Sequence, residues 1–151
     1  MSTVFEITQI STQETLGLRQ KVLKPFLPEA ECVNPGDELS STYHFGLWAE
    51  GQLISIATFI AEAHPDFIAK KPYRLRGMAT AKEFQGRGWG RQILRHGLKF
   101  LEENQCDFLW CNARIKAFSF YEKLDLTYYG PLFELNQIGP HKVMYKRLNP
   151  S

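Results

Sequence analysis

The chain has 151 residues, a usual size for one domain, and 44% of them are hydrophobic, which is enough for a substantial core. The formal net charge of +2 is too small to indicate a nucleic-acid-binding protein, although it does not exclude a small anionic ligand. No apolar run approaches the roughly 18 residues of a membrane span, so we expect neither nucleic acid nor membrane as a partner.

The chain begins with a predicted strand and a predicted helix. Residues 3–10 alternate apolar and polar side chains, which is typical of a strand. Ser11 and Glu14 follow with the spacing of a capping box, and the helix that they begin is ended by Pro25. Residues 25–41 are rich in proline and predict a loop with room for one short helix.

A hairpin and a third strand occupy the middle of the chain. Residues 42–50 and 52–63 predict its two strands, which a turn at Glu50 and Gly51 would join. A loop follows, and residues 73–80 predict another strand. A glycine-rich stretch then leads into a long amphipathic helix, with apolar residues at helical spacing from Ile93 to Leu101.

The remainder predicts a strand at residues 107–113, a short helix at 116–124, and a closing pair of strands at 127–135 and 141–148. Helices are therefore interleaved with the strands of a mixed sheet. This order predicts an α/β (α+β) fold around one mixed sheet that is covered on both faces. We expect a single domain over residues 1–151.

Three glycines, Gly86, Gly88 and Gly90, stand at alternate positions where the long helix begins. A helix N-terminus presents unpaired N–H groups and the positive end of the helix dipole, and glycines allow a ligand to approach them closely. Arg87 and Arg91 add positive charge. The stretch therefore predicts an anion site, most naturally for phosphate or pyrophosphate, although a plain glycine-rich turn would also account for it.

Two common phosphate-binding motifs do not fit this stretch. A Walker A motif needs Lys followed by Ser or Thr after its glycines, and the dinucleotide fingerprint needs a third glycine where Arg91 or Ile93 stands. The spacing that fits is Q-x-x-G-x-G, formed by Gln85, Gly88 and Gly90.

Two segments resemble the signatures of the GNAT superfamily of N-acetyltransferases. "RGMATAKEFQGRGWGRQIL" is similar to the acetyl-CoA signature, and "LWCNARIKAFSFYEKLDL" is similar to the family's strand–Asn–helix segment. The resemblance implies a mixed, mostly antiparallel central sheet of about six or seven strands, splayed between strands 4 and 5, with helices on both faces. It also implies acetyl-CoA as co-substrate, with no metal.

The resemblance assigns roles to particular residues. The positions that match the family's cofactor contacts are Met78, Thr80, Gln85, Gly86, Arg87, Gly88, Trp89, Gly90, Arg91, Asn112 and Phe118. Tyr121 matches the family's usual general acid, although it could instead be a core aromatic. Asn112 could also cap the helix that follows it. Asp125 departs from the glycine that commonly ends the second signature.

The implied activity is acetyl transfer from acetyl-CoA to a primary amine by direct attack in a ternary complex. We expect a small-molecule amine rather than a protein amine, and a monomer or homodimer. Glu134 and His141 lie on either side of the connection in the closing hairpin and are the candidate acceptor-site residues. The general base stays open among these two, His44 and Glu62. The alternative is a non-catalytic acyl-CoA-binding sensor or partner module on the same fold.

The cysteines and histidines bear on location and metal binding. Three cysteines, Cys32, Cys106 and Cys111, are too few to form a disulfide framework, which favours a reducing cytoplasm. The first residues lack the basic and apolar regions of a signal peptide. Four histidines without ligand spacing and the lack of a C-x-x-C pair predict no metal site.

Overall fold

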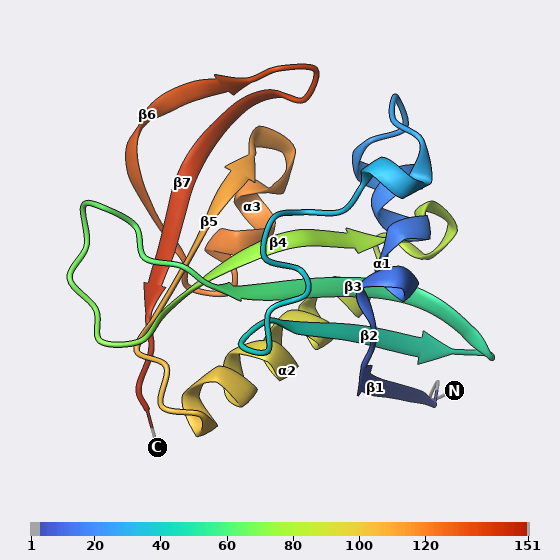
Figure 1. Cartoon of the computed structure of the whole chain (residues 1–151), viewed down its shortest axis with the longest axis horizontal. Coiled ribbons are helices and arrows are strands. Elements are labelled where there is room, and N and C mark those ends of the chain that lie inside the picture. The colour runs from blue at the N-terminus through green and yellow to red at the C-terminus, as the bar shows by residue number, and fades with distance from the viewer. Residues whose placement is uncertain (1–3, 151) are drawn as a thin grey trace. The chain divides into compact units, whose positions relative to one another are not determined.

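The computed structural model describes residues 4–150, in which seven strands form one sheet (Figure 1). The strands are β1 (Phe5–Gln9), β2 (Tyr43–Ala49), β3 (Gln52–Ala61), β4 (Pro72–Thr80), β5 (Phe108–Arg114), β6 (Thr127–Leu135) and β7 (Gly139–Arg147). The helices are α1 (Thr12–Leu18), α2 (Trp89–Glu103) and α3 (Phe118–Glu122). The predicted elements are confirmed; of the first predicted strand, Thr3 lies outside the described residues.

The hydrogen-bonded order of the strands is β1-β2-β3-β4-β5-β7-β6. The β1–β2, β2–β3, β5–β7 and β6–β7 pairs are antiparallel, and β4 and β5 are parallel. The recorded parallel ladder joins the first three residues of each strand and ends at the pair Arg74 and Trp110. The predicted mixed sheet, splayed between strands 4 and 5, is therefore confirmed.

The chain divides into two compact units. One comprises the chain up to Ile60 together with Gly77–Gly97, and the other comprises Ala61–Arg76 together with the chain from Leu98 on. The strands β1, β2 and β3 lie side by side in the first unit, and β5, β7 and β6 lie side by side in the second (Figure 1). That the chain acts as a single domain stays a prediction.

One face of the hairpin in the first unit packs against the start of α2. The turn between β2 and β3 has positive φ at Glu50 (53°) and Gly51 (73°), which matches the twist of a tight hairpin. The Phe45 ring lies 6.0 Å from that of Phe59 and 5.1 Å from that of His96. A Cβ built on Gly97 would stand 2.3 Å from the Phe59 ring, so only glycine allows helix and strand to approach this closely.

The other face of the same hairpin carries a buried ion pair. The guanidinium of Arg19 donates to both carboxylate oxygens of Asp37, at 2.7 and 3.0 Å, and also to the Thr58 hydroxyl at 3.0 Å. Side chains of Arg19 and Asp37 are 2% and 1% exposed. Burial alone would raise the pKa of the Asp37 carboxyl, but hydrogen bonds from Arg19 and from the Asn34 amide outweigh it, so this pKa lies below its usual value.

Local sequence signals set the structure of residues 11–31, the segment that carries Arg19. The predicted capping box is present, since the Ser11 hydroxyl accepts from the Glu14 amide and the Glu14 carboxylate accepts from the Ser11 amide. After α1 the chain continues as a π-helical turn, Arg19–Leu23, and the helical segment ends before Pro25, as predicted. A 3₁₀ turn at Glu29–Glu31 is the short helix expected in the loop.

The second unit is built on the core strand β5. Phe108 and Leu109 on β5, and Met144 on the neighbouring β7, are fully buried. The Asp107 carboxylate accepts from the amides of Lys70 and Lys71, at 2.8 and 2.9 Å, and so fixes the loop before β4. No helix in the described part of the chain is long and apolar enough to cross a membrane.

Candidate active site

The glycine loop lies between β4 and α2 in the first unit. The Ala81 amide donates to the Ile54 carbonyl at 2.8 Å, and the Gln85 side-chain amide donates to the Thr80 carbonyl at 2.9 Å. Gln85 of the signature therefore ties the loop back to the end of β4. Gly86 and Gly88 have φ of 79° and 86°, a backbone conformation that residues with a side chain rarely adopt.

The first turn of α2 is open to a ligand. At the start of the helix, the Gln92 amide donates a hydrogen bond to the Gly88 carbonyl at 3.1 Å. The amides before Gln92 in that turn have no acceptor within the helix, as at any helix N-terminus. A Cβ on Gly86 or Gly88 would meet no protein atom within 4 Å, so the space in front of the loop is free.

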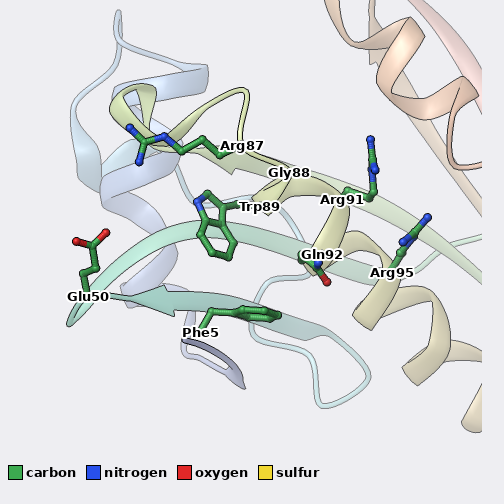
Figure 2. A pocket seen from close by; sticks show the side chains of 8 residues that line it. All are labelled: Phe5, Glu50, Arg87, Gly88, Trp89, Arg91, Gln92 and Arg95. Carbon is green, nitrogen blue, oxygen red and sulfur yellow. The ribbon is translucent and has the colours of Figure 1, made fainter. Parts of the chain in front are cut away.

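A pocket of about 480 Å³ adjoins this loop (Figure 2). Its lining consists of Phe5, Glu50, Arg87, Gly88, Trp89, Arg91, Gln92 and Arg95. Phe5 and Trp89 meet edge to face, with ring centroids 5.5 Å apart. Three arginines against one carboxylate make the pocket positive, which agrees with the predicted anion site.

The end of β4 has a distinctive backbone. Gly77 interrupts the strand with φ of 60°, and a Cβ there would stand 2.9 Å from Nε of Arg19. That Nε is buried and has no acceptor among the described residues. The predicted cofactor residues Met78 and Thr80 follow at once, and the Thr80 hydroxyl is hydrogen-bonded to Ser55 at 2.9 Å. A glycine within the predicted strand was the sequence signal for this irregularity.

The remaining predicted cofactor residues lie in the second unit. Asn112 is half-buried on β5, opposite Val143. The helical turn after β5 has Arg114 as its N-cap residue, without a side-chain cap, so the alternative that Asn112 caps the following helix is wrong. Phe118 begins α3, and its ring packs edge to face on Tyr128 at 5.1 Å.

Tyr121 is 8% exposed on α3, with its ring edge-on to Phe120. Burial raises the pKa of its phenol well above the ordinary value of 10.0; the Cys111 thiol adds to this, and Arg114 opposes it. Burial also raises the pKa of Cys111 to about 12. Both groups are therefore neutral near pH 7, and Tyr121 keeps the proton that a general acid needs.

The two candidate acceptor residues do not share a face. His141 lies opposite Phe133 in the β6–β7 ladder, and Glu134 lies opposite Pro140. Because successive residues of a strand point to opposite faces, Glu134 and His141 point away from each other. The two residues therefore cannot line one acceptor pocket from the same face of the hairpin, and their individual roles stay predictions. His141 is buried, and its Nδ1 is 2.8 Å from the Gly139 carbonyl oxygen.

The other two candidates for the general base are held by neighbours. His44 is buried between Thr58, at 2.8 Å, and both Thr12 and the Asp37 carbonyl. The Glu62 carboxylate is paired with Arg74 at 3.2 Å. Within residues 4–150 no group of three potential metal ligands comes together.

Sequence comparisons identify the class of protein that the splayed sheet and the glycine loop define. A model of the Acetyltransferase (GNAT) family matches residues 10–126. The chain is 34% identical over 148 residues to the uncharacterized N-acetyltransferase YitI of Bacillus subtilis (strain 168), covering 98% of this chain and 99% of that protein. The chain therefore belongs to the GNAT family and is an N-acetyltransferase.

Solved structures agree on the fold. FeeM, an N-acyl amino acid synthase from uncultured soil microbes, superposes with a TM-score of 0.78 at 13% identity, covering 97% of this chain and 92% of that one. An acyl-CoA N-acyltransferase from Pseudomonas aeruginosa gives 0.73 at 19% identity, covering 96% and 99%.

Proposed function

We propose that the protein transfers an acetyl group from acetyl-CoA to the primary amine of a small molecule, by direct attack in a ternary complex. The observation that carries this proposal is the loop of residues 85–91. Its two left-handed glycines open space in front of unpaired helix amides, and arginines flank it. Those features fit a pyrophosphate, which is the part of CoA that the family signature binds.

The chain's own residues would then act as follows. Backbone groups of Met78 and Thr80, with the side chain of Asn112, would position the pantetheine arm. When the amine forms its bond to the acetyl carbon, the carbon–sulfur bond breaks and the CoA thiolate leaves. Tyr121 would give its phenolic proton to that thiolate, since a phenol, with an ordinary pKa of about 10, is protonated near neutral pH. The bound co-substrate supplies the activated thioester.

A cytoplasmic location and a monomer or homodimer complete the proposal. All three cysteines are free and buried, which suits a reducing compartment. The choice of a small amine does not rest on the similar folds, which include both an N-acyl amino acid synthase and a ribosomal-protein alanine N-acetyltransferase.

A panel of small amines and lysine peptides, incubated with acetyl-CoA, tests the proposal. Thiol release that depends on one amine, with the acetylated amine seen by mass spectrometry, is the expected result. Tight CoA binding without acetylation of any amine would instead support the non-catalytic sensor. Acetylation of peptides alone would overturn the assignment of the acceptor.

We expect Gly88→Val to weaken CoA binding by at least about tenfold. A left-handed conformation costs a residue with a side chain roughly 1–2 kcal/mol, so the loop would pay that amount to reach its binding conformation. Calorimetry with CoA measures the change. Gly130→Val is the matched control, since Gly130 has φ of 77° and also has no neighbour within 4 Å of an added Cβ. Unchanged affinity in a folded Gly88→Val protein would contradict the prediction.

We expect His141→Ala to raise KM for the amine several-fold without changing the affinity for CoA. Glu134→Ala is the informative comparison, because the two residues point to opposite faces of the same ladder. At most one of the two variants should therefore change KM. If both leave steady-state kinetics as they are in the wild type, neither residue belongs to the acceptor site.

A further inference from the structure

Three arginines, one in the glycine loop and two in the first turns of α2, have no acidic partners among the described residues. Arg87, Arg91 and Arg95 are four residues apart and all line the pocket beside the loop. None of them forms an ion pair among residues 4–150. The helix has no acidic residue in its first turn. Like charges at this spacing and cations at a helix N-terminus both destabilise a helix, so the arrangement does not serve the helix itself.

The pocket has two parts, which differ in the side chains that line them. Arg91 and Arg95 extend from one side of α2 in a similar direction, away from Glu50 and Phe5 (Figure 2). They are four residues apart, which is about 6 Å along the helix axis. The only carboxylate in the lining, that of Glu50, lies across the pocket from them (Figure 2). The two arginines therefore form a local cationic site on the helix.

A second feature of the pocket also calls for a hydrogen-bond acceptor. The indole Nε1 of Trp89 is buried and has no acceptor among the described residues. A buried donor without an acceptor costs stability unless a bound group satisfies it. That indole N–H points toward the Arg87 side of the pocket, away from Arg91 and Arg95 (Figure 2), so it does not belong to their cationic site. The two arginines without carboxylates are by themselves satisfied by the oxygens of a phosphate.

We propose that Arg95, one turn beyond the loop, binds the 3′-phosphate of CoA and makes the enzyme select CoA over its 3′-dephospho form. This inference rests on the proposed function, because it takes the pyrophosphate to lie on the loop. CoA carries a 3′-phosphate dianion on its ribose, beyond the pyrophosphate, and one helical turn separates Arg95 from Arg91 at the start of α2. Arg91, between the two positions, reinforces the field at both.

The test compares binding of CoA and of 3′-dephospho-CoA by calorimetry at low salt. We expect the wild-type protein to bind CoA about tenfold more tightly, as a charge-assisted contact at an exposed site would give. Arg95→Gln should reduce this ratio to near one, mainly by weakening CoA. Lys99→Gln is the matched control, since it removes an exposed cation one turn further along and should keep the ratio. Raising the salt concentration should shrink the wild-type ratio.

The outcomes separate this inference from the proposed function. Equal affinity of the wild-type protein for both ligands, or an unchanged ratio in Arg95→Gln, overturns the role of Arg95 and leaves acetyl-CoA as the donor. Failure of the wild-type protein to bind either ligand overturns both proposals. An equal loss of ratio in Lys99→Gln would show a diffuse charge effect in place of a site at Arg95.

Discussion

Tyr121→Phe is expected to lower kcat at least about tenfold while the affinity for CoA stays nearly unchanged. The change removes one oxygen and keeps the ring, so the packing on Phe120 is preserved. In the proposed mechanism the phenol acts only as the thiolate leaves, so its loss should affect the transition state and not binding. Single-turnover rates with a saturating amine measure the chemical step directly.

The other buried tyrosine provides the control. Tyr73 is 2% exposed on β4, and Tyr73→Phe removes a phenol from the same unit without touching α3. Its kcat should match the wild type. A Tyr121→Phe rate within about twofold of wild type, when chemistry limits the rate, would assign the proton to water or to the amine.

The raised pKa of Tyr121 gives the same prediction a dependence on pH. A group whose pKa is raised by folding stays protonated until the pH passes that higher value. The wild-type rate should therefore show no loss from ionisation of Tyr121 up to about pH 10, the ordinary value for a phenol. A fall in kcat near pH 8 that Tyr121→Phe abolishes would contradict this environment.

Arg19→Met is expected to lower the free energy of unfolding by roughly 3–5 kcal/mol, because it leaves the Asp37 carboxylate buried without its partner. Urea unfolding followed by circular dichroism measures the loss. The double variant Arg19→Met/Asp37→Leu removes both charges and should recover much of the stability. A cost below about 1 kcal/mol for Arg19→Met alone would show that water or a rearranged neighbour solvates Asp37.

The ion pair also sets the response to acid. The pKa of Asp37 is lower in the folded protein than its ordinary value of 3.8, so its stabilising contribution is complete at neutral pH. That contribution is lost as the pH falls below about 4 and through the folded pKa. Asp37→Asn should therefore unfold with less dependence on pH in this acid range than the wild type.

Local sequence rules predicted the elements well. Hydrophobic alternation gave the strands, and the Ser11–Glu14 spacing gave the start of α1. The glycine loop was found because helix N-termini and left-handed glycines have a specific chemistry that is visible in the residue types. Asp125, with φ of 67°, has the left-handed conformation that glycine adopts most readily, as its place at the end of the second signature led us to expect.

Contacts between residues far apart in the chain could not be predicted from the sequence. The pair Arg19 and Asp37 joins a helix to a distant loop, and nothing in the local pattern of either residue shows it. The register of β6 against β7 places Glu134 and His141 on opposite faces, whereas their positions in the sequence show only that a short connection separates them. The proposal for Arg95 likewise depended on the pocket lining, because an exposed helical arginine is ordinary by itself.

The contact between Gly97 and the Phe59 ring has an evolutionary consequence. A Cβ at position 97 would stand 2.3 Å from that ring, so no other residue fits there while phenylalanine occupies position 59. The two positions can then drift only together, with a smaller partner at 59 accompanying any side chain at 97. Among homologous chains we expect correlated substitution at this pair, and a single change should be rare because it would displace the helix that carries the glycine loop.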